Sequence, residues 1–399
     1  MNLTEQQKNR GFWLLFFALF IDLLGFGIMI PLLPFYAESL GANAFVVALT
    51  MAVYSLGQFL FAPLWGRLSD RFGRRPIILV GLIGTSISFV LFGFASTLFL
   101  LFVSRILGGI LTAATLPTSQ AYVADMTSEK ERAKKFGMLG AAFGLGFIFG
   151  PAIGGLLSVY GYAVPAFFAA ALAFLNFLGA YFWLPETYKP APTEIKNYHL
   201  VDVRGMWKSI THEHIGALVI ISALIALGFS QLQGMYALFA EQRFGLGPTS
   251  VGFVLFVVGI VSVVVQGAVV GKVVAWIGEI KTVILGTLIL GLSYTLIGLS
   301  YNTTMLYIFT GINAAGFALS GPSLNALISG RAHKDEQGTI LGLSQSWAAF
   351  SRVIGPPFAG ILFGFGLALP FYMGAFFMLC AMLIAVRNYS FYAKDISQQ

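Results

Sequence analysis

The sequence predicts an all-α membrane protein with twelve transmembrane helices, arranged as two pseudo-symmetric bundles of six helices each. Three observations predict this fold: an apolar composition, a one-sided distribution of basic residues and an internal repeat. The 399 residues are 58% hydrophobic and only 10% charged, with a mean hydropathy of +0.85. Because soluble proteins carry about 25% charged residues, we expect most of the surface to face lipid rather than water.

A helix needs roughly 20 mostly apolar residues to cross a bilayer, and the chain holds twelve such runs. The predicted spans are 11–34, 44–66, 76–97, 99–123, 135–158, 163–184, 214–240, 249–271, 280–300, 303–329, 338–363 and 367–390. The first run contains Asp22 and ends in Pro31 and Pro34, which favours a retained helix over a cleaved signal peptide. The single cysteine, Cys380, excludes a disulfide framework and a cysteine-based metal site.

The 23 Lys and Arg residues lie almost entirely on one side of the predicted membrane. Twenty of them fall in the N-terminus, in loops that follow even-numbered spans, in the central linker or in the tail, and only Arg243 falls on the other side. Since cytoplasmic loops carry an excess of Lys and Arg, we predict a multi-pass protein of the cell (inner) membrane with both termini in the cytoplasm. The net charge of +7 then reflects topology rather than nucleic-acid binding.

The chain matches itself at a constant offset of 205 residues. Gly73 pairs with Gly278, and Gly150-Pro151 pairs with Gly355-Pro356, each at the same place within its span. A gap-free register over four helices indicates a duplicated six-helix unit. We therefore predict three parts, namely an N-terminal bundle at 1–184, a cytoplasmic linker at 185–213 and a C-terminal bundle at 214–399.

Several motifs point to a known family. The segment Gly66-Arg-Leu-Ser-Asp-Arg-Phe-Gly-Arg-Arg-Pro76 resembles the signature loop between helices 2 and 3 of the major facilitator superfamily. The segments 144–155 and 22–34 resemble the helix-5 and helix-1 motifs of drug/proton antiporters, and 121–137 and 239–244 are similar to the tetracycline/proton antiporters. The resemblance implies two bundles that rock around a cavity near the middle of the membrane, in exchange for protons.

The sequence departs from the tetracycline/proton antiporters at three positions. Gly108 stands in the arginine motif of the fourth span where the family usually has Gln, and Ser88 stands in place of a carboxylate in the third span. Arg352 is not expected in these antiporters. The departures argue against tetracycline as the cargo and leave the class of transporter unchanged.

Three ionisable residues lie at membrane depth, where a charge costs at least about 2.5–3.5 kcal/mol. Desolvation favours the neutral form of Asp22, so we predict that Asp22 carries the coupled proton; the alternative is a structural carboxylate in a glycine-rich helix. Arg105 stays charged and by resemblance tunes the proton site through Asp22, unless it is a fixed tie between helices 1 and 4. Arg352 favours an anionic or zwitterionic cargo if it faces the cavity, and indicates nothing about cargo if it reaches the interface.

Polar side chains within the spans are candidates for the substrate cavity. The predicted cavity residues are Gln58, Gln120, Gln231, Gln233, Tyr236, Asn313, Gln345 and Arg352. The alternative for each amide is an interhelical hydrogen bond that involves no ligand.

Two sets of residues are predicted to act in gating. In the loop between helices 2 and 3 they are Gly66, Asp70, Arg71, Gly73 and Arg74, and in helices 5 and 11 they are Gly150, Pro151, Gly355 and Pro356. The loop glycines allow a tight turn, the aspartate accepts hydrogen bonds from a helix N-terminus, and the arginines, with Arg75, pair with Asp125, Glu129 or Glu131. The Gly-Pro pairs permit close helix packing and bending.

Three functions remain open. The first is proton-driven antiport that exports small amphipathic compounds such as drugs, by a monomer that needs no cofactor and whose partners are its small-molecule substrate, protons and the bilayer. The second is transport of one metabolite, such as an organic anion, a siderophore or a sugar. The third is a membrane-embedded enzyme or lipid scramblase, which is disfavoured because the four His lie in loops or at helix edges and no phosphate-binding loop is present.

Overall fold

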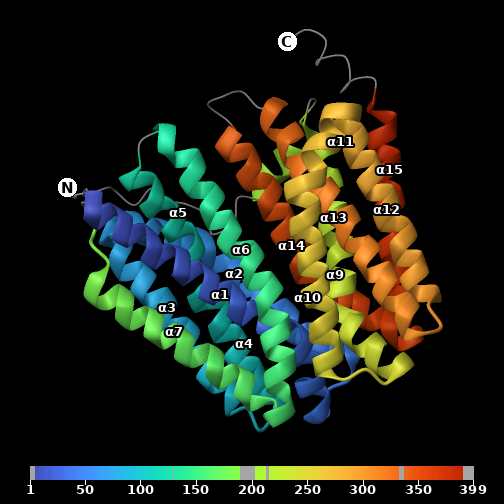
Figure 1. Ribbon diagram of the computed structural model, residues 1–399, viewed down its shortest axis with the longest axis horizontal. Coiled ribbons are helices and arrows are strands. Elements are labelled where there is room, and N and C mark those ends of the chain that lie inside the picture. The colour runs from blue at the N-terminus through green and yellow to red at the C-terminus, as the bar shows by residue number, and fades with distance from the viewer. Residues whose placement is uncertain (1–4, 128, 189–202, 213–214, 332–336, 390–399) are drawn as a thin grey trace. The chain divides into compact units, whose positions relative to one another are not determined.

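The computed structural model describes residues 5–127, 129–188, 203–212, 215–331 and 337–389 of the chain. Throughout these residues the chain forms helices joined by short turns, without a β-strand, as the ribbon in Figure 1 shows. The predicted all-α membrane class is thereby confirmed.

The described residues of the first half form seven α-helices. Their bounds are α1 Glu5–Ser39, α2 Ala44–Phe72, α3 Arg74–Gly93, α4 Leu98–Thr112, α5 Thr115–Met126, α6 Glu129–Leu157 and α7 Ala163–Trp183, with a 3-10 turn η1 at Ser158–Tyr160. Helices α4 and α5 together make the predicted fourth span, because the chain is interrupted only at Ala113 and Ala114.

The second half follows the same order. Its helices are α8 Val203–Ile210, α9 Gly216–Phe244, α10 Pro248–Val264, a π-helical turn η2 at Val265–Val269, α11 Val270–Ile277, α12 Glu279–Leu299, α13 Thr303–Arg331, α14 Gln337–Phe365 and α15 Leu369–Arg387. The short helix α8 lies in the predicted linker, most of which falls outside the described residues.

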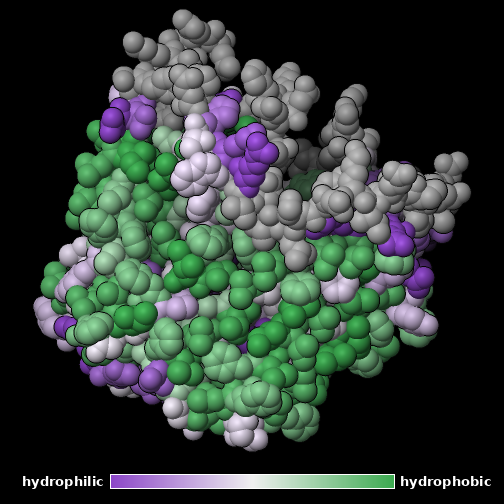
Figure 2. Space-filling view, turned by 180° about the vertical axis from the view of Figure 1, so that it is seen from behind, coloured by the Kyte–Doolittle hydropathy of each residue, from purple (hydrophilic) through white to green (hydrophobic). Residues whose placement is uncertain are grey.

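Eleven helices of the described residues are long and apolar enough to cross a membrane. The predicted tenth span, 303–329, is the 29-residue helix α13, which is not among these eleven. Three of its polar side chains are buried, since Asn313, Ser320 and Ser323 are at most 3% exposed, whereas Asn325, Ile308 and Ile312 are exposed. Figure 2 shows one face of the molecule covered largely by hydrophobic side chains, as lipid contact requires.

The chain divides into two compact units. The first unit comprises Met1–Ala42, Val53–Val201 and Gly247–Phe256, and the second comprises Asn43–Ala52, Asp202–Leu246 and Val257–Gln399. Each unit therefore includes the first turns of one helix from the other half of the sequence. In the first unit, the hydroxyl of Thr249 at the start of α10 donates to the carbonyl of Gly155 in α6 over 2.9 Å.

The 205-residue repeat is visible in the backbone. Gly73 joins α2 to α3 with φ of 100°, and Gly278 joins α11 to α12 with φ of 83°. Only glycine adopts such angles without a steric cost, so the two matched glycines make the same sharp connection in each half.

Glycine also lets helices approach closely within each unit. A Cβ on Gly150 would lie 2.7 Å from the Cα of Gly27, so α6 meets α1 backbone to backbone. In the second unit, a Cβ on Gly355 of α14 would overlap the hydroxyl of Ser230 in α9. Both glycines of the predicted Gly-Pro pairs thus occupy helix contacts that no larger residue fits.

Candidate functional site

Asp22 lies near the middle of α1 and accepts a hydrogen bond from a neighbouring helix. The hydroxyl of Thr85 in α3 lies 3.0 Å from Asp22 Oδ1 and also 3.0 Å from the carbonyl oxygen of Gly81. A hydroxyl has one proton to donate and can also accept. Thr85 can therefore donate to the Asp22 carboxylate, or accept from the protonated carboxyl while it donates to Gly81. The pair accommodates both protonation states of Asp22 without a change of partner.

Arg105 in α4 is held over an aromatic ring. Its guanidinium carbon lies 4.1 Å from the ring centroid of Tyr54 in α2, and the residue is 5% exposed. The ring face attracts the cation. The Tyr54 hydroxyl lies 3.0 Å from the hydroxyl of Thr112 and accepts from Gln58 Nε2 over 3.2 Å, so two further side chains fix the ring.

Asp22 and Arg105 have different partners. The Tyr54 ring contacts Arg105, whereas the hydrogen-bond partner of Asp22 is Thr85. Within the described residues, Asp22 and Arg105 form no ion pair. Helices α1, α2, α3 and α4 each contribute one side chain to this region, namely Asp22, Tyr54, Thr85 and Arg105. The action of Arg105 on Asp22 stays a prediction.

Two of the departures from the tetracycline/proton antiporters lie against each other. The Ser88 hydroxyl of α3 donates to the carbonyl of Ser104 in α4 over 3.0 Å. A Cβ on Gly108 would lie 2.5 Å from that hydroxyl. Ser88 thus joins α3 to α4, and Gly108 leaves the space that this contact needs.

Three predicted cavity residues are buried between helices and hydrogen-bonded there. Gln231 is 0% exposed and donates to the carbonyl of Gly355 over 3.2 Å. Tyr236 accepts from Thr310, and Asn313 donates to Ser293 over 2.9 Å. In this conformation these side chains join helices and are not accessible to a ligand. This agrees with the alternative given for the amides above, an interhelical hydrogen bond that involves no ligand.

The other predicted cavity residues are accessible. Gln120 in α5 and Gln345 in α14 are exposed, and Gln58, Gln233 and Arg352 are partly exposed. Arg352 has no ion pair or hydrogen bond among the described residues. Because hydrocarbon cannot satisfy polar side chains, exposed groups at membrane depth require contact with water.

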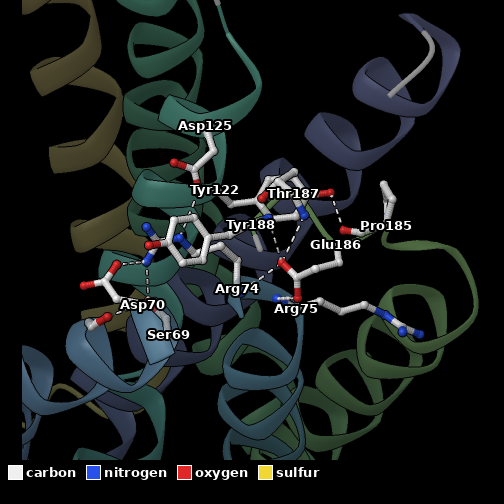
Figure 3. Close-up of polar contacts among 11 residues, drawn as sticks. Ser69, Asp70, Arg74, Arg75, Tyr122, Asp125, Pro185, Glu186, Thr187 and Tyr188 are labelled. Atoms are coloured by element: carbon white, nitrogen blue, oxygen red, sulfur yellow. Dashed lines mark hydrogen bonds and ion pairs between the residues drawn. The ribbon is translucent and has the colours of Figure 1, made fainter. Parts of the chain in front are cut away.

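A network of charged residues surrounds the start of α3 (Figure 3). Arg74 Nε lies 3.0 Å from Asp125 Oδ2, and Arg74 Nη1 donates to the Ser69 hydroxyl over 2.7 Å and to Asp70. The guanidinium carbon also lies 4.7 Å from the ring centroid of Tyr188. Arg74 thereby joins the ends of α2, α3 and α5 to the first residues after α7.

Sequence reasoning missed the residue that caps α3. Oxygen Oε1 of Glu186 accepts from the backbone N–H of Arg74 over 3.0 Å, and Oε2 accepts from that of Arg75 over 3.1 Å. A carboxylate at this end of a helix satisfies free N–H groups and complements the helix dipole. The Tyr122 hydroxyl holds the same segment by donating to the carbonyl of Pro185 over 2.8 Å.

Other gating predictions require correction. Gly66 lies inside α2, which continues to Phe72, so the turn rests on Gly73 alone. Asp70 accepts from Arg74 rather than from a helix N-terminus.

Arg71 and Arg75 have other contacts among the described residues. Among the described residues, neither forms an ion pair: Arg71 lies over the ring of Phe72, and Arg75 Nη2 donates to the Tyr181 carbonyl over 2.6 Å. The side chain of Glu129, the third proposed acidic partner, lies outside the described residues.

These features define a class of protein. Secondary transporters typically have many apolar spanning helices, an internal repeat, and ionisable residues held between helices. Residues 15–283 and 267–391 match the family model described as Major Facilitator Superfamily. The chain belongs to the major facilitator superfamily, and it is a multi-pass membrane transporter.

Individual relatives cover nearly the whole chain. Multidrug resistance protein 2 of Bacillus subtilis is 31% identical over 387 residues, which is 96% of each chain. The class B tetracycline resistance protein of Escherichia coli is 35% identical over 358 residues, or 87% of each chain. The predicted resemblance to drug/proton antiporters is thereby confirmed.

Solved structures show the same fold. The human organic anion transporter MFSD10 superposes with a TM-score of 0.71 at 24% identity, over 95% of this chain and 99% of that one. A POT family transporter in complex with 5-aminolevulinic acid gives a TM-score of 0.80 at 16% identity, over 96% of both chains. At these identities the likeness concerns the fold alone.

Proposed function

We propose that this chain is a proton-coupled antiporter that exports small amphipathic compounds, drugs among them, across a cell membrane with both of its termini in the cytoplasm. The observation that carries the proposal is the Asp22–Thr85 pair. Among the described residues, Asp22 is the one carboxyl that lies away from a helix end, and its partner serves both protonation states. The names of the multidrug and tetracycline resistance relatives support export of drugs.

In this proposal Asp22 takes up a proton from one side of the membrane and releases it to the other as the transporter changes conformation. Arg105 stays charged, and its positive charge lowers the cost of a charge on Asp22. The Asp125–Arg74–Tyr188 network holds the cytoplasmic ends of α3 and α5 together in one state of the cycle. The two Gly-Pro pairs provide the helix contacts that shift between states.

The proton step is tested in proteoliposomes with an acidic interior, where proton exit drives drug uptake. We expect Asp22→Asn to lose gradient-driven uptake and to keep exchange of drug for drug, because a neutral amide cannot carry the proton. Glu38→Gln, at the end of the same helix, is the matched control and should retain uptake. Full gradient-driven uptake by Asp22→Asn would show that Asp22 is not the proton carrier.

A second function, transport of one organic anion, is favoured by Arg352. This guanidinium is partly exposed in α14 and has no partner among the described residues. Growth-inhibition assays in a pump-deficient host separate the two functions. Protection against several unrelated drugs supports export, whereas unchanged drug sensitivity together with anion uptake that Arg352→Gln abolishes supports the second function.

A further inference from the structure

The helix formed by α10, η2 and α11 is less covered by protein than the other spanning helices. Over its most apolar window only 11% of the residues are buried, against 33–61% for the other ten spans of the described residues. Its buried residues include Val251, Gly252 and Val254 near the start and Val270 after the π-helical turn. The surface between these ends must contact either lipid or water.

One side of this helix is suited to lipid. The exposed side chains Phe253, Val257, Ile260 and Val264 follow one another at intervals of four, three and four residues. At 3.6 residues per turn, this spacing places them in one stripe.

The opposite side carries two polar side chains, beside the exposed Val263 and Val269. Gln266 lies nine residues after Val257, which at about 100° per residue puts it roughly half a turn away from the stripe. Ser262, four residues before Gln266, lies on the same side and donates to the carbonyl of Val258 over 2.9 Å. Gln266 itself is exposed, and its amide has no hydrogen-bond partner among the described residues.

Gln266 also lies in the π-helical turn. The N–H of Val270 donates to the carbonyl of Val265, five residues earlier, in place of the usual four. Such a turn adds one residue and leaves a backbone carbonyl without its helical partner. Turns of this kind inside α-helices occur frequently at functional sites, and α13 packs against this one.

We propose that Gln266 forms a cargo-binding site that hydrogen-bonds neutral polar groups, such as the carbonyls, hydroxyls and amides of an amphipathic compound. An amide facing hydrocarbon would leave two donors and an acceptor unsatisfied, which is strongly unfavourable. Its side of the helix therefore faces the aqueous path of the cargo, while the Phe253–Val264 stripe faces lipid. The proposal rests on the proposed function and names a residue and a ligand chemistry for it.

Water access is tested by cysteine labelling, which does not depend on transport. The single native cysteine makes this simple, because Cys380→Ala provides a cysteine-free background. We expect Q266C to react at least about tenfold faster than V264C with a charged, membrane-impermeant methanethiosulfonate, since thiols react as thiolates in water. Equal or slower labelling of Q266C would overturn the proposal.

Cargo contact is tested by transport kinetics in proteoliposomes with a drug that the wild type exports. Losing one hydrogen bond weakens binding about fivefold, so Gln266→Leu should raise KM by that factor with kcat retained. Gln266→Asn should restore part of the affinity, and Val264→Leu on the lipid stripe should change nothing. An unchanged KM for Gln266→Leu overturns this site alone, whereas a wild type that exports no drug overturns the proposed function.

Discussion

At the scale of single residues, the free-energy cost of a charge in the membrane made Asp22 and Arg105 candidates for proton coupling from sequence alone. Their partners Thr85 and Tyr54 were not predictable, because they come from other spans and depend on how each helix is rotated. A helix that is apolar on every side gives no periodicity from which that rotation follows. The same limit explains why Gln231 was predicted to line a cavity and is buried instead.

Tyr54 is predicted to support Arg105 mainly through its ring. Tyr54→Phe keeps the aromatic face and loses only the hydroxyl contacts to Thr112 and Gln58. Tyr54→Leu also loses the cation–π contact, which contributes about 2 kcal/mol when desolvated. The unfolding temperature in detergent should therefore be highest for the wild type, lower for Tyr54→Phe and lowest for Tyr54→Leu. The rate of gradient-driven transport should follow the same order. Equal effects of the two substitutions would contradict this role of the ring.

At the scale of elements, the glycine-rich signature correctly located the connection between α2 and α3 but not what stabilises it. The capping carboxylate of Glu186 lies 112 residues after Arg74 in sequence. A Glu that follows Pro185 at the end of an apolar span carries no signal for this role. The charged motif predicted the Arg74–Asp125 contact because opposite charges on loops predicted to lie on the same side of the membrane attract, whereas the orientation of Arg75 depends on the position of α7.

Gly73 and Gly278 form a matched pair for testing the connection. Both have positive φ with ψ near 160°, a conformation that costs a non-glycine residue about 1–3 kcal/mol. A Cβ on Gly278 meets nothing within 4 Å, whereas one on Gly73 would displace the Glu186 carboxylate. Gly73→Ala should therefore lower the unfolding temperature more than Gly278→Ala.

In a Glu186→Ala background, Gly73→Ala should lower the unfolding temperature no more than Gly278→Ala does, because no carboxylate is left to displace. A double-mutant cycle on unfolding temperatures in detergent measures this coupling. If Gly73→Ala and Gly278→Ala are equally destabilising in the wild-type background, Glu186 does not constrain the turn.

At the scale of the whole molecule, composition and the repeat were sufficient for the fold. The apolar runs predicted the spans, since lipid leaves few alternatives to helices. The 205-residue offset predicted that Gly73 and Gly278 make equivalent connections, and the positive φ of both agrees with it. The two units could not be predicted in detail, because the first turns of α2 and α10 each group with residues of the other half. Those contacts depend on the conformation, not on local sequence.

Orientation in the membrane is the remaining property of the whole molecule that the distribution of charge predicts. Twenty basic residues on one side strongly favour cytoplasmic termini. In the Cys380→Ala background, N302C lies at an exposed turn between α12 and α13 on the predicted outer side, and T211C lies at an exposed site after α8 on the predicted inner side. A membrane-impermeant maleimide should label N302C in intact cells and T211C only after permeabilisation. The reverse pattern would invert the topology and, with it, the direction in which the Asp22 proton drives the cargo.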